Sequence, residues 1–238
     1  MAIGKLLLTS NGITNDTIRE ALIDLLGKPI SESSAVFVPT AIYGFPKGGN
    51  YAWPLIKEPG ELGWKTFGVL ELTALPSLPK EFWLPQIEET DAIIVGGGNE
   101  FYLSYWMDKS GLFDLLPQLM EQGKVYVGAS AGSMVVTAAL NFDLDHFDKT
   151  GVYQDDEYNE GMPSSAGSAR TLRLVDFVIR PHLNGLDVFP QATLENMEKW
   201  AAKVDHPLYA LDDQSAVKVI DGKVEVISSG AWKLFGQQ

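Results

Sequence analysis

Short runs of consecutive hydrophobic residues, separated by segments with helical periodicity, fill the first half of the chain. A helix is expected over residues 15–26, because Ile18, Leu22 and Leu25 share one face. Strands that are hydrophobic throughout, rather than at alternate positions, are typical of parallel sheets covered on both faces. The pattern therefore predicts an α/β fold with a mostly parallel central sheet. The strands expected in this half span residues 5–9, 35–39, 64–70, 92–95 and 124–127.

The second half of the chain is less regular. Residues 141–168 are polar, acidic and rich in Gly, Ser and Tyr, which predicts a long loop. Asp221-Gly222 favours a C-terminal β-hairpin between the last two expected strands. No repeat or linker interrupts the pattern, so we expect a single domain over residues 1–238. The remaining elements are expected as a strand at 172–179, a helix at 192–204, and strands at 208–211, 216–220 and 224–228.

Composition and charge narrow the possible functions. The chain has no cysteine, which excludes disulfides and a thiolate nucleophile and leaves hydroxyl or carboxylate chemistry. Its formal net charge is −13 without a basic block, so a nucleic-acid partner is not expected. No hydrophobic run suits a signal peptide or approaches the roughly 20 residues of a membrane span. We expect a cytoplasmic protein with no membrane partner, as a monomer or a homodimer.

Ser130 is the candidate nucleophile. It lies in Gly128-Ala129-Ser130-Ala131-Gly132, after the strand at 124–127 and before residues 133–140, which can form a helix. Strand, tight turn and helix are the context of a nucleophile elbow. The helix amino terminus would offer N–H groups and a partial positive charge to an oxyanion. The alternative is a turn that only binds an anion or packs tightly.

A second glycine cluster, Gly96-Gly97-Gly98-Asn99, ends the preceding strand. Adjacent β-α units place their loops side by side, so the N–H of Gly98 is a candidate to share an oxyanion with the N–H of Ala131. The cluster is a poor phosphate loop, because neither Gly-Lys-Ser/Thr nor the dinucleotide fingerprint occurs there. We therefore expect neither a cofactor nor a metal ion.

A serine nucleophile needs a base, and the chain has three histidines. His182 follows the strand at 172–179, at the sheet edge where Ser130 is expected, whereas His146 and His206 lie in polar surroundings. His182 is therefore the expected general base. The carboxylate that orients it stays open between two groups. One group is Asp143, Asp145 and Asp148, and the other is Asp212 and Asp213.

Together, three segments resemble the signature of the dipeptidase E (aspartyl dipeptidase) family of serine peptidases, which is related to cyanophycinase. They are residues 95–101 (VGGGNEF), 127–133 (VGASAGS) and 180–184 (RPHLN). The resemblance runs from the first strand to the last. It implies a class I glutamine amidotransferase-like three-layer sandwich in which serine replaces the cysteine nucleophile.

The resemblance also implies roles for single residues. Ser130 would be the nucleophile, His182 the base, and the amides of Gly98 and Ala131 the oxyanion hole. By its distance from the nucleophile, Asp145 resembles the triad aspartate of aspartyl dipeptidase, while the cyanophycinase branch favours Asp213. We prefer Asp145, narrowly.

The expected activity is hydrolysis of short peptides or isopeptides through an acyl-enzyme on Ser130. Aspartyl dipeptidase has an arginine shortly after the nucleophile helix, but residues 140–146 contain neither arginine nor lysine. A strict requirement for amino-terminal aspartate is therefore not expected. Two alternatives are an α/β-hydrolase esterase and a catalytically silent protein of the same fold that binds a small ligand or a peptide.

Overall fold

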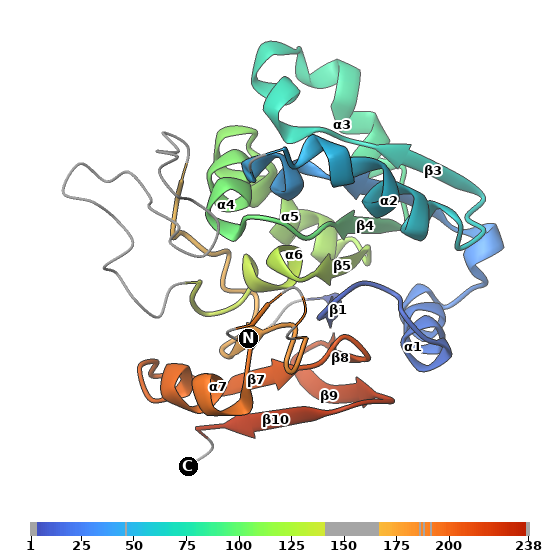
Figure 1. The fold of residues 1–238 in the computed structure, drawn as a ribbon. Coiled ribbons are helices and arrows are strands. Elements are labelled where there is room, and N and C mark those ends of the chain that lie inside the picture. The colour runs from blue at the N-terminus through green and yellow to red at the C-terminus, as the bar shows by residue number, and fades with distance from the viewer. Residues whose placement is uncertain are drawn as a thin grey trace.

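The computed structural model describes residues 4–45, 47–140, 167–185, 187, 189–190 and 192–236. A seven-stranded sheet in the order β3-β2-β4-β5-β1-β8-β9 forms the centre of the molecule (Figure 1). The first five of these strands are parallel, and β8 and β9 are added antiparallel as the C-terminal hairpin. The prediction of a mostly parallel central sheet is confirmed. The strands are β1 (Lys5–Thr9), β2 (Ser34–Val38), β3 (Thr66–Val69), β4 (Ala92–Val95), β5 (Val125–Ala129), β8 (Ser215–Ile220) and β9 (Lys223–Ser228).

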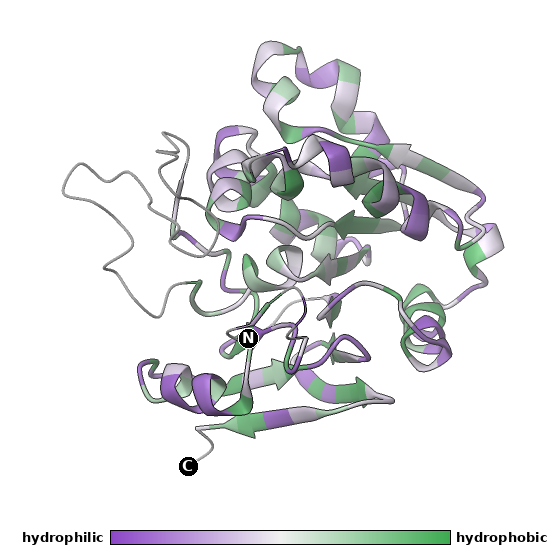
Figure 2. Cartoon of the chain, in the orientation of Figure 1, coloured by the Kyte–Doolittle hydropathy of each residue, from purple (hydrophilic) through white to green (hydrophobic). Residues whose placement is uncertain are grey.

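Helices cover both faces of this sheet and make the three layers of a sandwich. One face packs against α1 (Asp16–Leu26) and α2 (Gly49–Gly60). The other packs against α3 (Lys80–Glu88), α4 (Glu100–Lys109) and α5 (Leu112–Glu121). Hydrophobic residues accordingly fill most positions of the central strands (Figure 2). Short 3-10 helices lie at Ile30–Glu32, Thr40–Gly44 and Leu72–Ser77.

The first helix shows why the sequence signals for its ends were reliable. The side chain of Asn15 accepts a hydrogen bond from the N–H of Ile18 at 3.0 Å and so caps the helix. Gly27 ends it in the left-handed conformation, at φ 70°, which costs glycine little. Helix α1 therefore begins and ends within one residue of the predicted range.

A second, three-stranded sheet in the order β10-β7-β6 lies in the lower part of Figure 1, near β8 and β9 of the first. It consists of β6 (Val178–Arg180), β7 (Leu208–Leu211) and β10 (Trp232–Phe235), and α7 (Leu194–Ala201) packs on it through Met197. Strand β10 was not predicted. The strand expected over 172–179 is wrong for its first six residues, because only 178–180 pair with β7.

The helix expected over residues 133–140 is also shorter than predicted, because α6 covers only Ala131–Met134. The carbonyls of Val135 and Val136, which a longer helix would use internally, accept hydrogen bonds from the N–H groups of Leu172 and Leu174. Pairing with the segment that precedes β6 therefore replaces the later turns of the helix.

The predicted long loop at 141–168 lies almost wholly outside the described residues. The same holds for Asp143, Asp145, His146 and Asp148. Within the described part of the chain, no helix has both the length and the apolar character that crossing a membrane requires.

Candidate active site

Ser130 lies directly after β5, on a turn with unusual backbone geometry. Its φ and ψ are 51° and −113°, a combination that non-glycine residues rarely adopt. The turn is held by hydrogen bonds, since the Ser130 N–H donates to the Thr9 carbonyl at 3.1 Å. The Ser130 carbonyl in turn accepts from the N–H groups of Ser133 and Met134 at 2.8 and 3.1 Å.

The glycines on either side of this turn are required by close packing. A Cβ atom on Gly128 would lie 2.6 Å from the Cα of Ser133. A Cβ atom on Gly132 would lie 2.0 Å from the carbonyl oxygen of Val95 in β4. Both neighbours are backbone atoms in the core, so neither can move aside cheaply.

We expect Gly132→Ala to lower the free energy of unfolding by about 3 kcal/mol, because the added methyl group overlaps the backbone of β4. Denaturant unfolding followed by circular dichroism measures the change. Gly49→Ala is the matched control, since its Cβ would meet only Tyr43 Cε1, at 3.8 Å. Equal stability of the two variants would contradict the packing argument.

Three side chains from distant parts of the sequence meet at the edge of the sheet. The Nε2 atom of His182 lies 2.9 Å from the Oγ atom of Ser130, and its Nδ1 atom lies 2.7 Å from Oδ1 of Asp213. The side chain of His182 is 9% exposed and stacks on the ring of Phe189, with 4.1 Å between the ring centroids. Burial and stacking restrict the imidazole to an orientation in which both ring nitrogens have partners.

The charge of Asp213 is stabilised where it lies. Partial burial raises the pKa of this carboxyl, but hydrogen bonds from His182 and Ser10 and the positive charge of a protonated His182 lower it more. The pKa of Asp213 is therefore below its ordinary value. An ionised carboxylate at this position holds a proton on Nδ1 and leaves Nε2 free to accept one from Ser130.

The glycine cluster after β4 runs against Ser130. A Cβ atom on Gly97 would lie 3.2 Å from the Cβ of Ser130, and one on Gly98, at φ 142°, would lie 2.2 Å from the backbone of Ala41. Position 98 therefore admits only glycine. Among the described residues, the N–H of Gly98 has no hydrogen-bond acceptor. The N–H of Ala131 begins α6 and has no acceptor within that helix.

Helix α6 is a single turn, so its macrodipole is small. Stabilisation of an oxyanion by a helix dipole, as the sequence suggested, is therefore a minor effect at best. The individual N–H groups of Gly98 and Ala131 stay the candidate donors.

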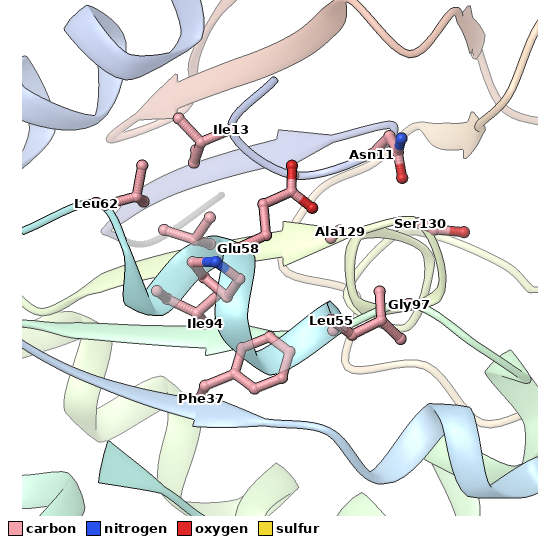
Figure 3. A pocket seen from close by; sticks show the side chains of 14 residues that line it. Asn11, Ile13, Phe37, Leu55, Glu58, Leu62, Ile94, Gly97, Ala129 and Ser130 are labelled. Carbon is pink, nitrogen blue, oxygen red and sulfur yellow. The ribbon is translucent and has the colours of Figure 1, made fainter. Parts of the chain in front are cut away.

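A mostly apolar pocket extends from Ser130 between the sheet and α2 (Figure 3). Glu58 is the one charged residue in its lining, and it has no ion-pair partner among the described residues. Its apolar walls come from Ile13, Phe37, Leu55, Pro59, Leu62, Ile94 and Val127. No group of three or more metal-binding side chains occurs in the part of the chain that the structure describes.

Of the candidate site residues, the structure thus brings Ser130, His182 and Asp213 into one hydrogen-bonded chain. Ala131 follows Ser130 directly, and Gly98 follows Gly97, which packs against Ser130. The preference for Asp145 stays untested, because that residue lies outside the described residues, but Asp213 occupies the position beside Nδ1. His206 precedes β7, at the opposite end of that strand from Asp213.

Sequence reasoning missed Ser10. It directly follows β1, is fully buried, and contacts both His182 and Asp213. Its place at the carboxyl end of a central parallel strand was the available signal, since ligand and catalytic groups gather there.

Comparison with known proteins places these observations in a family. The model described as Peptidase family S51 matches residues 6–227. Peptidase E of Streptomyces coelicolor is 31% identical over 143 residues, covering 57% of this chain and 51% of that protein. An uncharacterized peptidase of Pasteurella multocida is 28% identical over 138 residues, covering 56% of this chain and 58% of that protein. The chain thus matches little more than half the length of these relatives.

Two solved structures share the fold. A protein of Listeria monocytogenes assigned to Peptidase E superposes with a TM-score of 0.66 at 20% identity, covering 96% of this chain and 100% of that chain. A peptidase from an acI-B1 Actinobacterium superposes with a TM-score of 0.59 at 18% identity, covering 98% of this chain and 94% of that chain.

Proposed function

Because the chain belongs to peptidase family S51, we propose that it is a serine-type peptidase that cleaves short peptides or isopeptides, with Ser130 as the nucleophile. The observation that carries this proposal is the continuous hydrogen-bond chain from Ser130 Oγ through His182 to Asp213. A hydroxyl, an imidazole and a carboxylate in this order form the arrangement used for acyl transfer on many unrelated folds.

The proposed reaction proceeds in two steps. His182 Nε2 takes the proton of Ser130 while Oγ attacks the substrate carbonyl, and the N–H groups of Gly98 and Ala131 stabilise the resulting oxyanion. The same imidazole then protonates the departing amine, which leaves an ester on Ser130. A water molecule, deprotonated by His182, attacks that ester, and the imidazolium returns the proton to Ser130 Oγ as the acid is released. Asp213 stays ionised throughout and holds the Nδ1 proton.

The turn at Ser130 serves as the nucleophile elbow in this proposal. Strain at φ 51° and ψ −113° is retained because close packing at Gly128 and Gly132 leaves the turn no alternative path. The hydroxyl is thereby held toward Nε2 of His182 before substrate binds, which reduces the entropic cost of reaching the transition state.

The pocket beside Ser130 favours substrates with an apolar or basic side chain over those with an acidic one. Its walls are apolar, and Glu58 would repel a second carboxylate. The described lining contains no cation that could pair with an aspartate side chain. This fits the lack of arginine and lysine over 140–146.

A library of dipeptides and isopeptides tests this substrate class. We expect kcat/KM to be higher for substrates with amino-terminal Leu or Lys than for those with amino-terminal Asp. In Glu58→Gln, the ratio of kcat/KM for Lys to kcat/KM for Leu should fall by about threefold to fivefold, because an exposed charge such as that of Glu58 interacts weakly. The control is Glu61→Gln, because Glu61 pairs with Lys57 and does not line the pocket. A preference for amino-terminal Asp, or equal effects of the two variants, would contradict the role of Glu58.

A further inference from the structure

Ser10 joins the two sheets at the point where the three proposed catalytic side chains meet. It follows β1, which lies between β5 and β8 in the central sheet. His182 and Asp213 instead follow β6 and β7 of the second sheet. Ser10 is fully buried, so water does not compete for its hydrogen bonds.

The hydroxyl of Ser10 closes a ring of hydrogen bonds. Its oxygen accepts from the backbone N–H of His182 at 2.8 Å and lies 2.9 Å from Oδ1 of Asp213. The same Oδ1 atom is the partner of His182 Nδ1 at 2.7 Å. The hydroxyl has one proton, and the carboxylate is a nearer and stronger acceptor than the Leu211 carbonyl at 3.2 Å. Ser10 thus donates to Asp213 and accepts from His182.

This ring restrains two groups, in addition to the stacking of His182 on Phe189. His182 has φ 62°, an unfavourable backbone conformation for a residue with a side chain, and the bond to Ser10 stabilises its N–H there. The side chain of Asp213 is 37% exposed, so without Ser10 the carboxylate could rotate toward solvent.

We propose that Ser10 is a positioning residue of the catalytic site: its hydroxyl fixes the distance and orientation between Asp213 and His182 and thereby aligns Nε2 with Ser130. The proposal rests on the serine peptidase function proposed above. It assigns Ser10 no contact with substrate, so its removal should affect the chemical step rather than binding.

The test compares Ser10→Ala with wild type in steady-state hydrolysis and in the rate of labelling by a fluorophosphonate. We expect kcat and the labelling rate to fall by about 10- to 100-fold with KM little changed, since a hydrogen bond to a charged group is lost. Ser10→Thr, which keeps the hydroxyl, should recover most of the labelling rate. Ser104→Ala is the matched control: this buried hydroxyl donates to the Arg170 carbonyl and not to Ser130, His182 or Asp213.

A double-mutant cycle separates positioning from general stability. If Ser10 acts through Asp213, then Ser10→Ala should cost much less in an Asp213→Asn background than in wild type. Additive losses, or a loss no larger than that of Ser104→Ala, would overturn the proposal. If Ser10→Ala does not fold, Ser10→Cys replaces it in the same comparisons. A thiol is similar in size to the hydroxyl but is only a weak hydrogen-bond donor.

Failure of this inference is distinguishable from failure of the proposed function. A wild-type protein that the probe labels at Ser130, with Ser10→Ala labelled as fast, would refute the positioning role alone. A folded wild-type protein that the probe does not label would refute the peptidase function and the positioning role with it.

Discussion

Ser130→Ala is expected to abolish labelling by a fluorophosphonate and to lower kcat by about 10⁶-fold, because the acyl-enzyme can no longer form. The phosphorus atom of the probe reacts only with a hydroxyl that a neighbouring base activates, and Ser130 is the hydroxyl at 2.9 Å from His182 Nε2. Intact-protein mass spectrometry detects the adduct, and peptide mapping locates it.

Ser133→Ala is the matched control for this experiment. Ser133 belongs to the same turn, but its buried hydroxyl donates to the carbonyl of Thr9 and does not contact His182. Its variant should still be labelled at Ser130. Labelling of wild type no faster than of Ser130→Ala would contradict catalysis. A ligand-dependent rise in Tm that survives Ser130→Ala, without turnover, would instead support the silent binding protein.

Asp213→Asn is expected to lower kcat by about 10⁴-fold. An amide at this position can donate its own N–H to Nδ1 and so favour the tautomer in which Nε2 carries the proton and cannot accept one from Ser130. KM should change far less, because Asp213 does not line the substrate pocket. Steady-state kinetics on the best substrate of the library measures both constants.

Asp145→Asn is the companion variant, because Asp145 is the alternative third member that the sequence favoured. If Asp213 orients His182, then Asp145→Asn should retain activity within a few-fold of wild type. A large loss with Asp145→Asn and a small one with Asp213→Asn would reverse the assignment.

Much of the site could be predicted because parallel strands bring their carboxyl ends to one edge. Ser130 follows β5, and the glycine cluster at 96–98 follows β4, and these strands are neighbours in the sheet. Their proximity was therefore a consequence of local signals: two hydrophobic runs, each followed by glycines. His182 was chosen by the same reasoning, but its strand β6 belongs to the second sheet, so its closeness to Ser130 depends on how the two sheets pack together.

The shortened helix after Ser130 shows where local signals fail. Residues 133–140 can form a helix, but their backbone groups bond instead to the segment 172–177, more than thirty residues later. Helix propensity amounts to a few tenths of a kcal/mol per residue, and such long-range pairing outweighs it.

The sequence by itself determined the α/β fold, the strand-turn-helix around Ser130, the neighbouring glycine loop and the choice of His182. Only the tertiary structure decided which described carboxylate meets that histidine, and that the hydroxyl of Ser10 contacts both. Parallel pairing of β6 with β7 sets Arg180 level with Ala210, which brings the residues just beyond each strand, His182 and Asp213, to the same height. Ser10 joins them from another sheet. Such contacts depend on the register and packing of strands far apart in the chain, which hydrophobic pattern and residue spacing do not encode.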